Sequence, residues 1–230
     1  MKHVLGSGLL LSALVAAHPL HAQTCNGMPM RGRGAVAATY LNGDAAETPL
    51  ELKQYGGAVL YQIPGWSPFH TRHAVRVEGR YGDASAEERL NGLVVSRFPG
   101  HQYGASAGYT VDVLPHSYVG QYVVCLNAGA DASHWDIDGA SGTVFTIPAD
   151  LSFGIDLHRG AFGVTPHVGF GAFWHHASGD TPLGRVQRSG FKPWNEGGIG
   201  VTVGPMHVDA AVRHEFKVRE RGRISVGWFF

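Results

Sequence analysis

The amino-acid sequence predicts an all-β fold in which antiparallel strands close an up-and-down barrel. Apolar and polar residues alternate along most of the chain, and this two-residue period is typical of strands with two different faces. Glycine is frequent, with 33 residues and no collagen-like period. The alternation also runs to the last residue, Phe230. A strand that is ordered to its end needs a partner on both edges, and barrel closure provides that partner.

The N-terminal residues have the pattern of a secretory signal peptide. Met1-Lys2-His3 is a short basic start, the stretch from Val4 to Ala17 is apolar, and Ala22 is the small residue that precedes a cleavage site. The apolar stretch is too short to anchor the chain in a membrane. The sequence therefore predicts three parts: a signal peptide at 1–22, an N-terminal periplasmic segment at 23–32 and a barrel at 33–230.

Strand positions follow from the alternation. Residues 162–174 show it most clearly, because the even-numbered positions are apolar while most odd-numbered positions are Gly, Thr or His. No segment has sustained helical periodicity, and residues 83–91 offer at most a short loop helix. Strands are expected near residues 33–42, 55–63, 72–82, 102–114, 118–129, 143–156, 160–174, 192–204, 206–217 and 222–230.

The connections between these strands set their number. Tight turns are expected at 115–117, 158–160 and 204–205, whereas 129–142 and 175–190 are longer polar stretches. Short turns at one end and longer loops at the other are typical of membrane barrels. The count is about ten strands, and an even number is needed if both ends of the barrel lie in the periplasm. Residues 91–98 leave eight strands as the alternative.

A membrane barrel explains the sequence better than a soluble β-domain does. The alternation alone also fits a secreted sandwich or a lipocalin-like barrel. Three features favour the membrane: the terminal Phe229-Phe230, a polar face that mixes glycine with charges of both signs, and aromatic residues at strand ends. These aromatic residues are Tyr40, Tyr81, Tyr103, Trp174, Trp194 and Trp228.

The polar face predicts a lumen filled with charged side chains. A barrel of eight to ten strands is wide enough only for its own side chains, and buried charges of both signs must pair. We expect an ion-pair network that fills and stiffens the interior; a narrow, gated channel for ions or small solutes is the alternative. The expected network comprises Arg76, Glu78, Arg80, Asp112, Asp150, Asp156, His167, Asp209, Arg213 and Glu215.

The two cysteines of the chain, Cys25 and Cys125, are expected to form a disulfide. A signal peptide implies an oxidising compartment, where two lone cysteines most simply pair. The bond would tie the N-terminal segment to a strand of the barrel. Two free thiols are the alternative.

One pair of side chains offers a start for catalysis. His176 and Ser178 lie two residues apart on one face of a strand, where the histidine can reach the hydroxyl as a base reaches a nucleophile. This arrangement resembles the His-x-Ser of the outer-membrane lipid A 3-O-deacylases, and the resemblance implies a downstream Glu, for which Glu196 is the nearest candidate. Gly179 stands where that family usually has Asn. Lipid A hydrolysis is therefore an alternative function, and the leading expectation is a protein that is not an enzyme.

The chain as a whole resembles small bacterial outer-membrane β-barrels of the OmpA-transmembrane or OmpX kind. The resemblance covers nearly all of the chain after the signal and rests most on Ile224, Val226, Trp228 and Phe230. It implies a monomeric, multi-pass barrel in the bacterial outer membrane, in contact with lipids and lipopolysaccharide. It also implies that the barrel-assembly machinery reads Val226, Trp228 and Phe230 as an insertion signal, and that the protein acts as an envelope scaffold or surface-interaction protein.

The balance of charge narrows the expected partners. Lys+Arg and Asp+Glu both number 18, so no overall field favours nucleic acid as a partner. The run Asp136-Ile137-Asp138-Gly139 is similar to the start of a calcium-binding loop but lacks the closing Glu at the required distance, so neither a metal nor a cofactor is expected.

Overall fold

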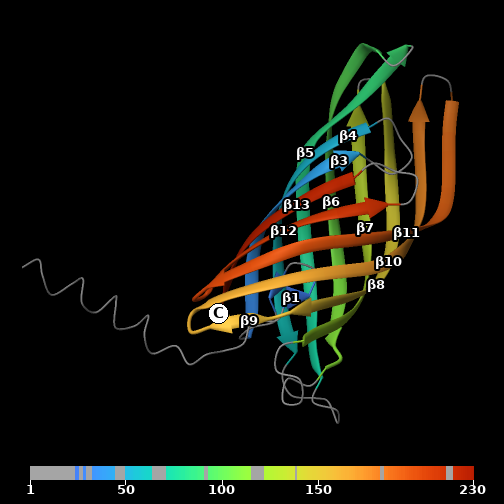
Figure 1. Ribbon diagram of the computed structural model, residues 1–230. Coiled ribbons are helices and arrows are strands. Elements are labelled where there is room, and N and C mark those ends of the chain that lie inside the picture. The colour runs from blue at the N-terminus through green and yellow to red at the C-terminus, as the bar shows by residue number, and fades with distance from the viewer. Residues whose placement is uncertain are drawn as a thin grey trace, which may run out of the picture.

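The computed structural model describes residues 24–25, 28–29, 33–44, 50–63, 71–90, 93–114, 122–137, 139–181, 184–215 and 220–230. All regular structure in these residues is β (Figure 1). The long strands are β3 (Gly34–Asp44), β4 (Leu50–Ile63), β5 (Arg72–Leu90), β6 (Leu93–Asp112), β7 (Tyr122–Ile137), β8 (Ala140–Ile155), β10 (Phe162–Thr181), β11 (Gly184–Val203), β12 (Met206–Glu215) and β13 (Glu220–Phe229).

Three short strands complete the set within the described residues. The short β9 (Leu157–Arg159) continues β8 along the same edge of β10, so the two occupy one position in the wall. The strands β1 (Thr24–Cys25) and β2 (Met28–Pro29) pair only with each other, as a separate small hairpin.

The wall closes because the first and last long strands pair. β13 lies antiparallel to β3, and β11 pairs with both β10 and β12. Phe230 extends this seam, since its carbonyl accepts a hydrogen bond from the Arg33 N–H (2.9 Å) and its own N–H donates to the Gly34 carbonyl (3.1 Å). The expected antiparallel barrel is confirmed, with ten strand positions and not eight.

The register of the strands sets their tilt. Starting from Asn42 on β3, the directly opposed residues can be followed around the wall in two directions. The route through β4 to β10 arrives at Arg185 on β11, whereas the route through β13 and β12 arrives at Gly197 on the same strand. The wall therefore closes with a stagger of twelve residues, the separation of 185 and 197. For ten strands this stagger corresponds to a tilt of roughly 40° and to an interior that side chains can fill.

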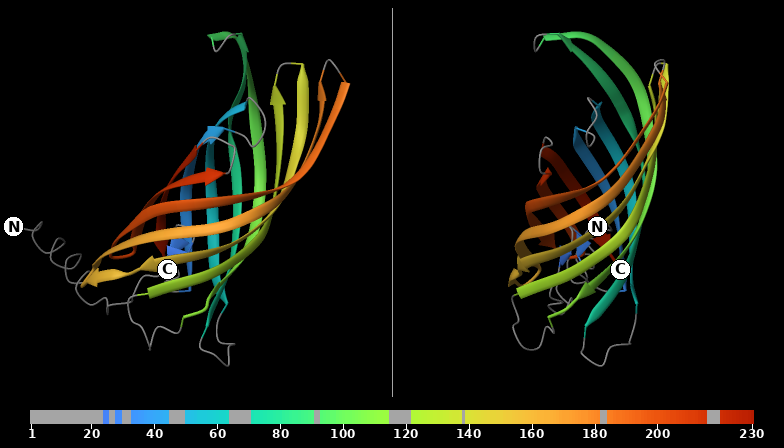
Figure 2. Two further views of the ribbon diagram at one scale, coloured as in Figure 1. Left: turned by 45° about the vertical axis from the view of Figure 1, so that its right-hand side comes forward. Right: turned by 90° about the vertical axis from the view of Figure 1, so that its right-hand side faces the viewer.

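Three hairpins rise beyond the rest of the wall. β5 and β6 contain 19 and 20 residues, whereas β12 and β13 contain 10 each. The hairpins β5–β6, β7–β8 and β10–β11 therefore make one side of the barrel much taller (Figure 2). We call this end of the barrel the hairpin end, and the opposite end, which carries Arg33 and Phe230, the terminal end.

The hairpins correct several expectations about loops. Residues 83–90 belong to β5 and not to a loop helix, and most of 91–98 belongs to β6. The stretches 129–142 and 175–190 fall almost entirely within strands. The physical reason is that strand pairing satisfies the backbone in water as well as in lipid, while apolar side chains are needed only where a strand faces lipid.

The tight connections fall where the sequence predicts them. The turn expected at 158–160 lies at Gly160 and Ala161, and the other lies at Gly204 and Pro205. Gly160 and Gly204 have φ of 62° and 57°, a conformation that glycine adopts without steric cost. The turn expected at 115–117 and the signal peptide at 1–22 lie outside the described residues.

Burial alternates along the strands and separates two faces. Val226, Trp228 and Phe230 are exposed on the outer face, whereas Ser225 and Phe229 are buried on the lumen face. The outer faces together form an apolar band. No helix among the described residues has the length and apolar character needed to span a membrane.

A charge placed in the apolar band tests this assignment. Val77 is 55% exposed on the outer face of β5, about midway along the band. Val77→Arg is expected to lower the free energy of unfolding in lipid vesicles by about 2–4 kcal/mol, because the guanidinium loses water at the bilayer midplane. Gln187→Arg, on the exposed part of β11 at the hairpin end, is expected to cost less than about 1 kcal/mol. Denaturant titration of both variants in lipid vesicles measures the two losses of unfolding free energy. Equal losses would contradict the assignment of Val77 to the lipid-facing surface.

Candidate functional site in the lumen

The N-terminal hairpin crosses the lumen near the terminal end. β1 contacts β7, whereas β2 contacts β12, β13 and β3. In the closed wall β7 lies opposite β13, five strand positions away in either direction, so the hairpin bridges two opposite sides of the barrel. Figure 1 shows β1 within the outline of the wall. The hairpin thus occupies the interior as a plug.

A disulfide attaches this plug to the wall. Cys25 and Cys125 are bonded, as expected, with Cα atoms 5.9 Å apart across a sequence separation of 100 residues. Both cysteines are buried within an apolar layer. The layer comprises Cys25, Ala35, Ala58, Leu60, Ala74, Val123, Cys125 and Phe229. Phe229, which does not fit the outward pattern of the last strand, therefore contributes to the lumen core, and its ring lies 6.3 Å from that of His207.

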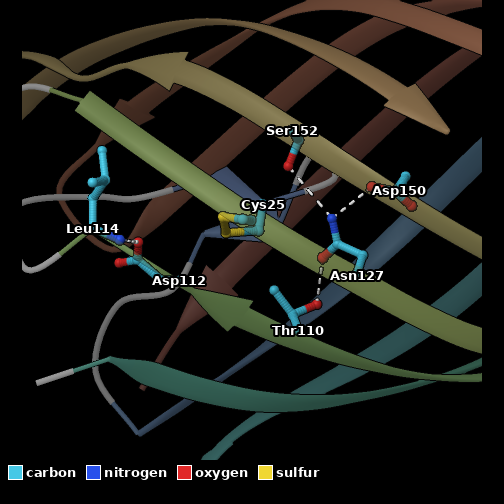
Figure 3. The surroundings of a disulfide bond; sticks show 8 residues. Cys25, Thr110, Asp112, Leu114, Asn127, Asp150 and Ser152 are labelled. Atoms are coloured by element: carbon cyan, nitrogen blue, oxygen red, sulfur yellow. Dashed lines mark hydrogen bonds between the residues drawn. A yellow bond between two sulfur atoms is a disulfide. The ribbon is translucent and has the colours of Figure 1, made fainter. Parts of the chain in front are cut away.

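A hydrogen-bonded polar cluster lies beside the disulfide. Asn127 is two residues beyond Cys125 on the same face of β7 (Figure 3). Its carbonyl oxygen accepts a hydrogen bond from the Thr110 hydroxyl (2.7 Å), and its amide donates to Asp150 (2.6 Å) and Ser152 (3.4 Å). One amide therefore links three strands of the wall, which are β6, β7 and β8.

The main charged network spans β10 to β13. Arg223 Nη2 donates to Glu196 Oε1 (2.9 Å) and to Asp209 Oδ1 (3.4 Å). Asp209 Oδ2 also pairs with His167 Nε2 (2.7 Å), and Glu196 Oε2 accepts from Arg213 Nε (3.1 Å). The Glu196 and Asp209 side chains are 5% and 0% exposed, so both carboxylates depend on these partners. One chain of hydrogen bonds and ion pairs therefore links four strands, β10 to β13.

Two smaller ion pairs line β5. Arg76 pairs with Glu78 two residues along the same lumen face (2.5 Å), and the Thr39 hydroxyl donates to Glu78 (2.9 Å). Arg80 pairs with Asp131 on β7 across the intervening β6. This reach is possible because the lumen face of β6 carries small residues at this level, Gly104 and Ser106.

Glycines provide room for large lumen side chains on neighbouring strands. A Cβ at Gly171 would lie 2.8 Å from the Trp194 ring and 2.5 Å from the Cβ of Asp150. The Arg213 guanidinium lies 3.9 Å from the centre of the Trp194 ring. A Cβ at Gly198 would similarly lie 2.6 Å from the His167 ring. Large rings in the lumen therefore require bare backbone on the adjacent strand.

The structure places all ten residues of the expected charge network on the lumen face. Besides the pairs above, Glu215 lies 3.4 Å from Arg221, and the Thr165 hydroxyl is 3.5 Å from Asp156. Asp112 accepts from the Leu114 N–H (3.3 Å). The expected set omits Asp131, Arg221 and Arg223. Each of the three alternates along its strand with outward-facing residues, so the same two-residue period would have assigned them to the lumen face.

Trp194 and Glu196 require reassignment. Trp194 was expected in an interfacial girdle, but it is 3% exposed and lies in the lumen. Glu196 was the candidate third member beside His176 and Ser178, but it pairs in register with Gly169, seven residues from His176 along β10. The structure therefore does not bring Glu196 to His176.

His176 instead contacts a serine on the next strand. Its Nδ1 lies 2.7 Å from Ser189 Oγ, and its ring stacks on Trp174. A similar bond links His134 Nδ1 to the Thr143 hydroxyl (3.2 Å). Because the same unit recurs with a threonine, the geometry favours a structural or binding role over nucleophile activation.

Comparison with known proteins supports the fold. No family model matches the chain, and no curated protein matches its sequence. The translocator domain of the autotransporter NalP from Neisseria meningitidis is similar, with a TM-score of 0.51 at 10% identity over 86% of this chain and 87% of that one. The beta domain of the Bordetella autotransporter BrkA has a TM-score of 0.46 at 11% identity, with coverage of 86% and 98%.

The likeness to NalP concerns the fold alone because the identity is only 10%. Together with the closed ten-stranded wall and the apolar outer band, it identifies a transmembrane β-barrel fold of the kind found in outer-membrane proteins. The expected resemblance is confirmed at this level.

Substitution at a lumen glycine tests the packing. Gly171→Ala is expected to lower the free energy of unfolding by about 1–3 kcal/mol, since the new methyl group meets Trp194 and the Asp150 Cβ. Gly197→Ala is the control, because a Cβ at this outward glycine meets nothing within 4 Å. Denaturant titration of both variants provides the comparison. Similar values would show that the lumen is loosely packed.

Removal of Arg223 tests the charged network. Arg223→Met is expected to cost about 3 kcal/mol or more of unfolding free energy, because Glu196 and Asp209 each lose a buried partner. The exposed Arg159 provides the control Arg159→Met, for which a change below about 0.5 kcal/mol is expected. Adding Glu196→Gln to Arg223→Met should recover part of the lost unfolding free energy, because one unpaired buried charge is removed. If the effects of the two substitutions simply add, Arg223 and Glu196 are not directly coupled.

Proposed function

We propose that the protein is an integral outer-membrane β-barrel with a closed lumen, which acts as an envelope scaffold or surface-interaction protein. The observation that carries the proposal is the doubly filled interior. The disulfide-anchored hairpin and its apolar layer occupy the terminal end, and paired charges occupy the lumen beyond them. An interior filled in this way stiffens the wall and leaves the outer surface and the tall hairpins as the parts that meet other molecules.

The outer surface supports the membrane placement. An apolar band with few polar residues, such as the exposed Asn195, is the surface that a barrel presents to lipid. The terminal end then faces the periplasm, and the tall hairpins face outward from the cell. This orientation also puts Val226, Trp228 and Phe230 where the assembly machinery would meet the closing strand. Lipopolysaccharide and other outer-membrane lipids would contact the band, and the barrel would work as a monomer.

A narrow channel is the main alternative, and conductance separates the two. The oxidised protein in a planar bilayer is expected to show no steady conductance, because the hairpin and the ion pairs fill the lumen. Sustained, reproducible current steps would contradict the proposal and support a channel.

The Cys25→Ser/Cys125→Ser variant tests the hairpin separately. Loss of a bond that closes a long loop removes stabilisation of about 4–5 kcal/mol in the chain-entropy description, so the hairpin should leave the lumen more often. Brief current transients are therefore expected only in this variant. If it were as silent as the oxidised protein, the ion pairs alone would account for closure.

A further inference from the structure

Three outward-facing histidines on different strands share one local arrangement. His101 stacks on Tyr81 with ring centroids 5.9 Å apart, and its Nδ1 lies 3.3 Å from the Tyr81 hydroxyl. His134 lies 5.2 Å from the ring of Tyr103, and its Nδ1 lies 3.2 Å from the Thr143 hydroxyl.

The third histidine, His176, likewise contacts an aromatic ring and a hydroxyl group. His176 lies 6.2 Å from the ring of Trp174 at an interplanar angle of 12°, and its Nδ1 lies 2.7 Å from the Ser189 hydroxyl. Each unit thus combines an imidazole, an aromatic ring and a hydroxyl on β6, β7 or β10. We call His101, His134 and His176 with their aromatic partners the histidine collar.

The strand register brings the collar to one height. Tyr81, Tyr103, His134, Thr143 and Ser178 form one cross-strand row. Because the strands are tilted by roughly 40°, this row climbs toward the hairpin end by about 3 Å per strand, while two residues along a strand rise about 5 Å.

The offsets of the three histidines compensate for that climb. His101 lies two residues above the row on β6, His134 lies in it on β7, and His176 lies two residues below it on β10. The three imidazoles therefore lie at one level, within about 2 Å.

This level is the upper edge of the apolar band. On β10 the outward residues Phe170, Ala172 and Trp174 precede His176, and Asp180 lies on the same face beyond it. On β7 the outward residues before His134 are apolar, and Asp136 follows it. The collar lies where lipid tails end and headgroups begin.

The chemistry of the collar suits a phosphorylated headgroup. In each ring Nδ1 is near a hydroxyl, while Nε2 makes no hydrogen bond to the described residues. Such an Nε2–H can donate to a phosphate oxygen, and protonation of the ring adds charge. Asp83, 3.8 Å from His101, is a competing acceptor, and the cross-strand partner of Asp83 on the same face is the cation Lys53.

In His73, by contrast, both ring nitrogens contact hydroxyl groups of the protein. It lies toward the terminal end of β5, where Nδ1 contacts the Tyr109 hydroxyl (2.5 Å) and Nε2 contacts the Thr71 hydroxyl (2.9 Å). Both nitrogens are used within the protein. His73 is therefore a matched control with the same ring pairing and no nitrogen left for a ligand.

We propose that the histidine collar binds the phosphorylated sugar headgroup of an outer-leaflet glycolipid. The imidazoles hold the phosphates, and the aromatic rings beside them present flat apolar faces to the sugar. This inference rests on the proposed outer-membrane placement, because only the outer leaflet puts such a headgroup at the level of the collar.

Lipid titration of the purified, folded barrel in detergent tests the proposal. Bisphosphorylated lipid A, its dephosphorylated form and phosphatidylglycerol are compared by native mass spectrometry, with the unaltered protein, the triple variant H101A/H134A/H176A and the control H73A. The unaltered protein and H73A should bind the bisphosphorylated form about tenfold more tightly than the dephosphorylated one, and the triple variant should lose this preference. Should the triple variant not fold, each single variant is expected to lose about twofold.

Two results would contradict the proposal that the histidine collar binds a phosphorylated headgroup. One is a phosphate preference that survives in the triple variant or disappears equally in H73A. The other is binding of phosphatidylglycerol as tight as that of bisphosphorylated lipid A, which would indicate plain charge attraction. Failure of the outer-membrane placement appears in a different measurement, as recovery of the protein outside the outer-membrane fraction of cells.

Discussion

Closure of the wall between β13 and β3 is the constraint on which the rest of the structure depends. In lipid each backbone N–H and C=O needs a partner within the protein, and only a closed sheet gives every strand two neighbours. Closure with ten strands and a twelve-residue stagger also fixes the width of the interior. That width admits side chains and one thin hairpin. The composition of the lumen follows from this limit.

Lumen side chains must fill the space and also neutralise one another. Large groups such as Trp194 and His167 fit because Gly171 and Gly198 leave bare backbone opposite them. Buried carboxylates such as Asp209 are tolerated because the Arg223 guanidinium and the His167 ring, on two other strands, reach them. The disulfide adds a covalent tie at the terminal end, where the surrounding layer is apolar. Packing, pairing and cross-linking thus act at successive heights along one interior.

The outer surface follows a different requirement at each height. Apolar side chains face outward along the band, and polar ones follow on the hairpins beyond it. Histidine suits the boundary between these zones because one ring nitrogen can be held by the protein while the other remains directed outward. The tilt of the strands explains why residues at different positions along β6, β7 and β10 lie at one level there.

Much of this organisation could be predicted from the sequence. The alternation determined the all-β class, the two faces of each strand, the ten strand positions and the lumen side of residues such as Arg76 and Asp209, because side-chain direction in a strand is a local property with a period of two. The cysteine pair was predictable because the chain contains no other thiol.

Only the tertiary structure decided how far the strands extend and which side chains meet. The hairpins beyond the band were expected as loops because polar strands in water carry no apolar signal. The aromatic character of Trp194 at a strand end predicts the outer surface, whereas its place in the alternation, in phase with Glu196 and Gly198, agrees with the lumen position that the structure shows. The partners of Arg223 on two other strands, the bridge of the N-terminal hairpin from β7 to β13 and the common height of His101, His134 and His176 all depend on register and stagger. These are properties of the closed sheet, set by pairings between distant segments, and no single strand contains them.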